Sequence, residues 1–118
     1  MTLEAFYNEI GSDYKAALTR MGNSEKMLGK FVRKFTADKS MSELNASFDG
    51  GDYPTAFRMA HTLKGLCANL GLDKLQHSSA ELTEALRGGV VADNAAELLA
   101  QVRADYDMTV AALAQLDE

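Results

Sequence analysis

Apolar residues at helical spacing run through almost the whole of this 118-residue chain, and this feature constrains the fold more than any other. Proline, which breaks helices from within, occurs once, at Pro54, where the first turn of a helix tolerates it. No stretch alternates convincingly between apolar and polar residues, as a half-buried strand would. The spacing therefore predicts an all-α fold.

Capping residues and glycines divide the chain into helical segments. Ser, Thr and Asp side chains accept hydrogen bonds from the first backbone N–H groups of a helix, and glycine favours helix ends. On this basis we predict two short helices followed by four longer ones, over residues 2–10, 13–21, 24–48, 52–70, 73–87 and 93–116. The third segment is expected to bend, and its inner positions are Leu28, Phe31, Val32 and Phe35.

The connections between the long amphipathic helices are short, which favours antiparallel neighbours. We therefore predict an antiparallel up-down four-helix bundle with one or two short N-terminal helices. No internal repeat, linker or low-complexity tract interrupts the chain, so residues 1–118 are expected to form a single domain. Because a four-helix core can be self-sufficient, a monomer is the expected state.

Charge and cysteine content narrow the classes of function. The formal net charge is −5 and lysine and arginine form no cluster, which disfavours nucleic acid and anionic lipid as partners. Cys67 is the only cysteine, so no disulfide can form within the chain and a reducing compartment is expected. No apolar run approaches the ~20 residues of a membrane-spanning helix. We expect a soluble cytoplasmic protein that binds neither nucleic acid nor membrane.

The predicted helix over 52–70 places a histidine on its outward face. At ~100° per residue its apolar side chains form one broad core face, and His61 points almost opposite the centre of that face. The core face comprises Ala56, Met59, Ala60, Leu63, Leu66, Cys67 and Leu70. The periodicity that builds the core thus also puts His61 on the surface.

The surroundings of His61 favour phosphoryl transfer. Mid-helix Gly65 costs ~1 kcal/mol relative to alanine, and bare surface that lets another protein's active site approach the imidazole would compensate. Lys64 lies one turn along and can hold a phosphoryl oxygen by a charge-assisted hydrogen bond. Neutral imidazole is a good nucleophile near pH 7. We predict His61 as phospho-acceptor and Lys64 as its phosphoryl contact, beside a docking face of Phe57, Arg58, Gly65 and Ala68.

Residues 60–71, AHTLKGLCANLG, resemble the signature of histidine-containing phosphotransfer (HPt) domains. In that family the active histidine is followed by lysine at the third place and by glycine at the fourth and tenth, and the residues after His61 match all three. Ala68 is the small residue usual at the seventh place. The close match covers residues 57–71, and a looser one in helix lengths and apolar positions extends over most of the chain.

The resemblance implies a carrier without catalytic machinery or a cofactor of its own. A response-regulator receiver domain, phosphorylated on aspartate, would dock on the His61 face, pass its phosphoryl group to His61 and supply the Mg²⁺. A second receiver would then accept the group, and a hybrid sensor histidine kinase is a further expected partner. The chain is expected to be a free-standing carrier, although a piece of such a kinase would look similar.

By an approximate alignment Thr83 stands where the family often has Glu or Gln near the active histidine. A threonine hydroxyl, a water or a backbone carbonyl could therefore orient the imidazole.

Two other functions stay open. A helical adaptor or dimerisation module would bind its partner through Phe57, Gly65 and Ala68, with His61 incidental. An enzyme using His61 as a general base would need a second catalytic group, and no serine, cysteine or carboxylate has a sequence-evident place beside it. The two histidines and the cysteine lack the spacing of metal ligands, so no metal site is predicted.

Three residues have simpler expectations. His77 is also expected on the surface, but Ala80 and Glu81 occupy the third and fourth places after it, so it is predicted to be an ordinary surface residue. Cys67 is expected to be an inert core thiol. Phe57 is equally compatible with an interface anchor and with a partly buried core residue.

Overall fold

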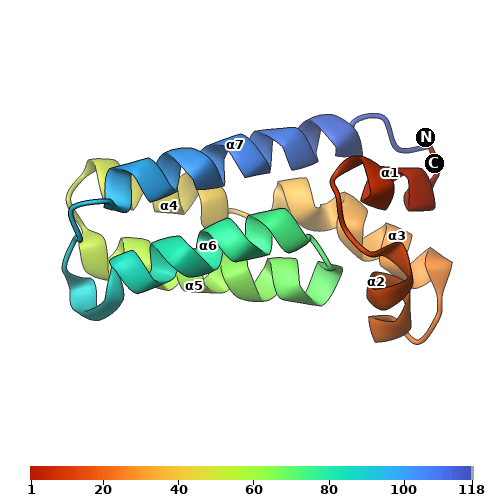
Figure 1. Ribbon diagram of the computed structural model, residues 1–118, viewed down its shortest axis with the longest axis horizontal. Helices are drawn as coiled ribbons and strands as arrows, with labels where there is room; N and C mark the ends of the chain where they lie inside the picture. Colours follow the sequence, from red (N-terminus) through yellow and green to blue (C-terminus); the bar gives the residue numbers. More distant parts are fainter. Residues whose placement is uncertain (118) are drawn as a thin grey trace.

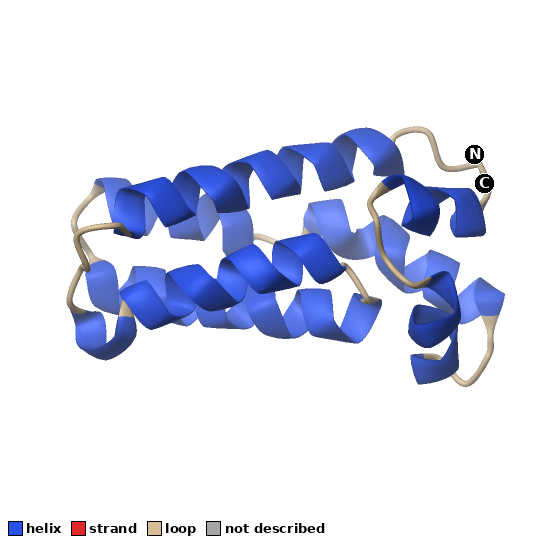
Figure 2. Cartoon of the chain, viewed as in Figure 1, coloured by secondary structure: helices blue, strands red, loops and turns tan. Residues whose placement is uncertain are grey.

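The computed structural model describes residues 1–117, and in this part of the chain every regular element is a helix (Figure 2). The all-α prediction is confirmed. The α-helices are α1 (Leu3–Glu9), α2 (Tyr14–Arg20), α3 (Glu25–Arg33), α4 (Ser40–Asp49), α5 (Tyr53–Leu70), α6 (Asp73–Ala85) and α7 (Ala95–Leu113). Two 3₁₀ turns, η1 (Lys34–Ala37) and η2 (Arg87–Gly89), follow α3 and α6.

Side-chain caps begin several of these helices where the sequence predicts a start. Thr2, Asp13, Ser24 and Asp52 each accept a hydrogen bond from the backbone N–H three residues further on. The Asp52 cap also holds the pKa of its carboxyl below the ordinary range, because Thr55 donates to the charged form. These local bonds determine where α1, α2, α3 and α5 begin, without any tertiary contact.

The segment predicted as one bent helix over 24–48 is instead two helices, α3 and α4. The chain passes through η1 and becomes extended at Asp38 (φ −71°, ψ 136°), and the Asp38 carboxylate then accepts a hydrogen bond from the Ser40 N–H at 2.8 Å. An aspartate side chain can in this way accept a backbone N–H that would otherwise donate to a carbonyl oxygen one helical turn earlier. The prediction of a single bent helix is therefore wrong, because the backbone leaves the helical conformation at Asp38.

Helices α4, α5, α6 and α7 lie alongside one another, with α5 packed against both α4 and α6, and α6 also packed against α7 (Figure 1). The short helices α1, α2 and α3 gather at one end, where both chain termini lie. Both flanks of α5 are thus covered, and one strip along its length faces outward. The largest fully buried side chains include Phe6, Tyr7, Leu28, Leu44, Leu63, Leu82 and Leu99.

The C-terminal end of α5 is fixed against the N-terminal helices. The Tyr7 hydroxyl donates to the Leu70 carbonyl oxygen at 2.5 Å, and burial raises the pKa of this phenol well above its usual value. Gly71 ends α5 with a φ of +71°, and a Cβ at this position would come 2.7 Å from the Cβ of Ala17. Glycine is therefore required here both by the left-handed backbone and by the closeness of α2.

Candidate functional site

His61 lies in the middle of α5, on the strip that neither α4 nor α6 covers, and its side chain is exposed. Within residues 1–117 the imidazole has no hydrogen-bond partner; its contact is the Phe57 ring, whose centroid is 6.3 Å from that of the imidazole at an interplanar angle of 31°. The helical periodicity predicted this exposure. An imidazole held on a rigid helix with both nitrogens open can meet a group carried by another molecule.

Gly65 leaves bare surface one turn beyond His61. A Cβ built at Gly65 would meet no atom within 4 Å, so no packing against the rest of the fold requires glycine there. The helix-packing explanation for this glycine is therefore excluded, and its ~1 kcal/mol helical cost has no structural compensation within the described residues. What the glycine provides is room beside the imidazole, next to half-buried Ala68.

Phe57 joins the histidine to a cation from η2. Its ring is partly buried against the core, while the guanidinium carbon of Arg87 lies 5.4 Å from the ring centroid. A shallow hollow of about 360 Å³ is lined by Phe57, Arg58, His61, Thr62 and Arg87. Phe57 is thus a partly buried core residue that also borders the surface around the histidine, so it combines the two positions that the sequence allowed.

A carboxylate from α6, Glu84, lies near two cations, Arg87 of η2 and Lys64 of α5. Arg87 donates from Nε and Nη2 to the two carboxylate oxygens of Glu84, at 2.9 and 2.5 Å. These bonds, more than the charge of half-buried Lys64, lower the pKa of the Glu84 carboxyl. Glu84 and Arg87 were missed by the sequence analysis. Their spacing could have indicated the pair, because residues three apart lie on one helix face and can form an ion pair. The packing of α6 against α5 then brings this pair near the helix that carries His61.

Thr83 does not face the imidazole. Its side chain is fully buried, and its hydroxyl donates to the Ser79 carbonyl oxygen at 2.7 Å. The suggestion that a threonine hydroxyl orients the histidine is therefore wrong. The helical phase explains the outcome, since the residue exposed at this level of α6 is the next one, Glu84.

His77 and Cys67 behave as the sequence predicts. The His77 side chain is 78% exposed, and its Nε2 lies 2.9 Å from a carboxylate oxygen of Glu81 on the same helix. Cys67 is completely buried, and this burial raises the pKa of its thiol to about 12. A thiol with such a pKa carries almost no thiolate at neutral pH and is not a nucleophile.

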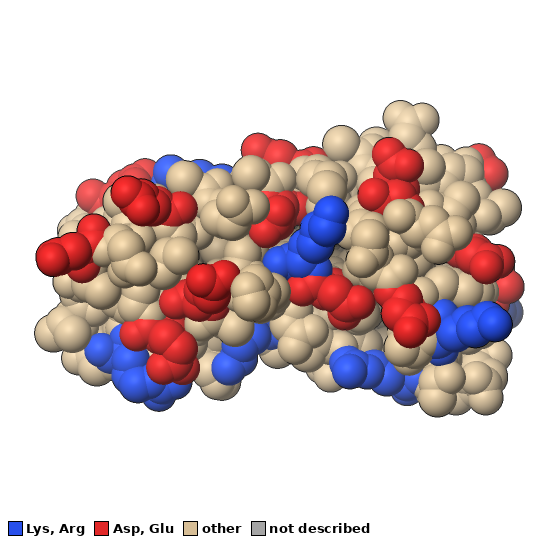
Figure 3. Space-filling view, in the orientation of Figure 1, with Lys and Arg blue, Asp and Glu red and all other residues tan. Residues whose placement is uncertain are grey.

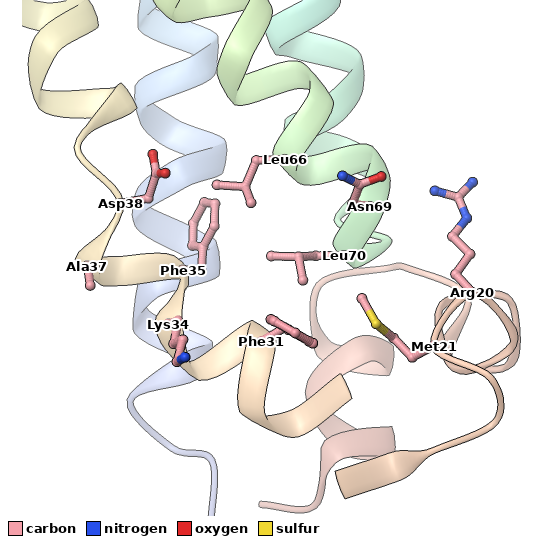
Figure 4. Close-up of a pocket in the computed structure, with 10 residues that line it drawn as sticks. All are labelled: Arg20, Met21, Phe31, Lys34, Phe35, Ala37, Asp38, Leu66, Asn69 and Leu70. Atoms are coloured by element: carbon pink, nitrogen blue, oxygen red, sulfur yellow. The ribbon is translucent and has the colours of Figure 1, made fainter. Parts of the chain in front are cut away.

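A second hollow, of about 910 Å³, lies toward the C-terminal end of α5, away from the histidine (Figure 4). Phe31, Leu66 and Leu70 converge on it, with Arg20 and Lys34 at its border. Phe31 was predicted to be an inner residue but is 38% exposed here. The prediction of an inner position for Phe31 is therefore wrong.

Charge is spread over the molecule rather than gathered into one field. Figure 3 shows acidic and basic side chains interspersed over the visible face, in keeping with a net charge of −5. Within residues 1–117 no three His, Cys, Asp or Glu side chains are grouped to hold a metal ion. No helix in the same range is both long enough and apolar enough to cross a membrane.

Comparison with known protein families matches residues 26–116 to the Hpt domain. The match covers most of the chain, and the chain therefore belongs to the Hpt domain family, whose members transfer phosphoryl groups through a histidine in two-component signalling. Hpt domains interact with receiver domains and act as carriers of the group rather than as classical enzymes. Searches of curated proteins and of solved structures return no match.

Proposed function

We propose that this protein is a phosphorelay intermediate that accepts a phosphoryl group on His61 from a receiver-domain aspartate and passes it to a second receiver. The observation that carries the proposal is the outward imidazole beside Gly65, where none of residues 1–117 comes within 4 Å of the space that a Cβ would take. The frame for the site is an antiparallel up-down bundle of α4 to α7 forming one domain with α1 to α3. The packing of consecutive helices supports this arrangement.

The transfer needs little from this chain beyond position. An imidazole nitrogen attacks the phosphorus of the aspartyl phosphate, an N–P bond forms, and the P–O bond to the aspartate breaks and leaves a free carboxylate. The reverse step delivers the group to the next receiver. Lys64 contacts the phosphoryl oxygens, and the incoming receiver brings Mg²⁺ and most of the electrostatic stabilisation.

The partners follow from the same chemistry. Receiver domains dock over Phe57, Arg58, Gly65 and Ala68, a face with one aromatic ring, one cation and two small residues. A hybrid sensor histidine kinase is the proposed upstream source, and the carrier works as a cytoplasmic monomer with no cofactor of its own. The rival function is an adaptor that uses this face without any chemistry on His61.

The test is transfer from phosphorylated receiver domains of the same cell. Acid-labile, base-stable label should appear on the protein and be absent from His61→Gln. The adaptor function instead predicts that receiver affinity is retained and that no label is transferred. Label on His61→Gln equal to that on the unaltered protein would show that another residue is the acceptor.

A further inference from the structure

We propose that Glu84 and Arg87 form a latch that sets how strongly His61 holds its phosphoryl group. This inference rests on the proposed function. In the unphosphorylated protein Glu84 binds Arg87, and when His61 carries the phosphoryl group Arg87 leaves Glu84 and binds the phosphoryl oxygens. Arg87 is then a contact of the transferred group, and Glu84 is a positioning residue that acts through it.

The geometry places Arg87 one aromatic ring away from the imidazole. Its guanidinium carbon is 5.4 Å from the Phe57 centroid, and the Phe57 centroid is 6.3 Å from that of His61. Arg87 and His61 also border the same hollow. A side chain as long as arginine can cross such a distance by changing rotamers, so the cation is within reach of a phosphoryl group on His61.

The latch can open because both of its members are exposed. The Arg87 and Glu84 side chains keep 59% and 64% of their surface accessible, and exposed ion pairs of this kind add little stability. A phosphoryl group carries a charge of about −1.5 to −2 near neutral pH and offers three acceptor oxygens, whereas a carboxylate carries −1 and offers two. The planar guanidinium can bind either in the same bidentate manner, so the larger charge favours the exchange.

Glu84 also interacts with Lys64, the second cation of the site. Lys64 contributes to the low pKa of the Glu84 carboxyl, which means that the two charges interact across the α5–α6 contact. Glu84 therefore competes with a phosphoryl group for both Arg87 and Lys64. Its own negative charge opposes the incoming one as well, so Glu84 weakens the phosphorylated state.

The experiment measures the phosphorylation equilibrium with phosphoramidate, a donor that needs no partner protein. Its P–N bond breaks, an N–P bond to His61 forms, and ammonia leaves, so a fixed phosphoramidate-to-ammonia ratio defines the equilibrium. ³¹P NMR then gives the phosphorylated fraction. Glu84→Gln should raise the equilibrium constant about threefold to fivefold, the range of exposed charge pairs. Arg87→Gln should lower it about twofold to threefold.

Glu81→Gln is the matched control, because it removes the same charge from the same helix. Glu81 pairs with His77 rather than with a cation of the site, so the equilibrium should stay at the value of the unaltered protein. Combining Glu84→Gln with Arg87→Gln should shrink the gain seen with Glu84→Gln alone. A gain that depends on the presence of Arg87 cannot come from a general change in structure.

Two results would overturn the latch. The first is an equal equilibrium constant for the unaltered protein, Glu84→Gln and Glu81→Gln. The second is a Glu84→Gln gain of the same size with and without Arg87, which would assign the effect to Lys64 or to bulk charge. Failure of the proposed function looks different, because the unaltered protein would then take no phosphoryl group on His61 from a phosphorylated receiver, whatever its equilibrium with phosphoramidate.

Discussion

Two histidines stand exposed on neighbouring helices of this protein, and only their surroundings distinguish them. His61 on α5 has an open glycine one turn away, a partly buried aromatic ring against it and no carboxylate bonded to it among the described residues. His77 on α6 lies beside the Glu81 carboxylate at 2.9 Å. Exposure alone therefore does not distinguish the two histidines; the open space beside His61 and the carboxylate beside His77 do.

The largest effect is expected from exchanging each histidine in turn. His61→Gln should abolish phosphoryl transfer from a phosphorylated receiver, because glutamine offers no nucleophilic nitrogen. His77→Gln should leave the transfer rate within about twofold, since it changes only an exposed pair. Radiolabel transfer followed on gels gives both rates, and a loss of label in His77→Gln would erase the contrast between the two sites.

The next contrast is between Gly65 in the middle of α5 and Gly71, which ends that helix. Gly65→Glu should weaken receiver binding by about tenfold or more, because bulk and negative charge enter the docking face, while its exposed Cβ leaves the melting temperature unchanged or slightly raised. Gly71→Ala should do the opposite. It should lower the free energy of unfolding by about 1–2 kcal/mol through its left-handed backbone alone, with a further loss from the 2.7 Å approach to Ala17.

Calorimetry and receiver titration separate these two outcomes. Normal receiver affinity in Gly65→Glu would refute the idea that this glycine exists for a close approach. A Gly71→Ala variant that melts at the temperature of the unaltered protein would show that α2 can move aside.

The contrast between His61 and His77 could be predicted from the sequence because helical periodicity reports exposure directly. The spacing of apolar residues put His61 opposite the core face, and Thr2, Asp13, Ser24 and Asp52 marked helix starts through local bonds that need no tertiary information. The sequence could not show which face of one helix packs against its neighbour. Thr83 was placed near the imidazole by alignment, and only the packing of α6 on α5 turns it inward and brings Glu84 and Arg87 to the site.

The α3–α4 break shows a second limit of the same kind. A bent helix and two helices joined by an extended residue share one apolar pattern, and what separates them is whether Asp38 stays helical or becomes extended and accepts the Ser40 N–H. The outcome of this local competition between side chain and backbone cannot be read from apolar spacing.

A smaller effect is expected from the cation that the sequence did identify. Lys64→Ala should slow transfer about tenfold, the loss of one charge-assisted hydrogen bond to the phosphoryl group. The free energy of unfolding should change by no more than about 0.5 kcal/mol, because the partner charge at Glu84 is exposed. Rapid-quench transfer kinetics and chemical denaturation give the two numbers, with Lys74→Ala as control on exposed α6 surface. An unchanged transfer rate would remove Lys64 from the mechanism.

The smallest effect should come from the buried side of α6. The Ser79 hydroxyl oxygen is buried with no hydrogen-bond partner in the described chain, whereas the Thr83 hydroxyl one turn later is satisfied by the Ser79 carbonyl. Ser79→Ala should therefore raise the free energy of unfolding by up to about 1 kcal/mol, because an unpaired polar group leaves the core. Thr83→Val should leave that free energy nearly unchanged or lower it, since it removes a satisfied bond. Neither variant should alter the rate at which His61 accepts a phosphoryl group, and a change in that rate would mean that the core of α6 and the site on α5 are coupled.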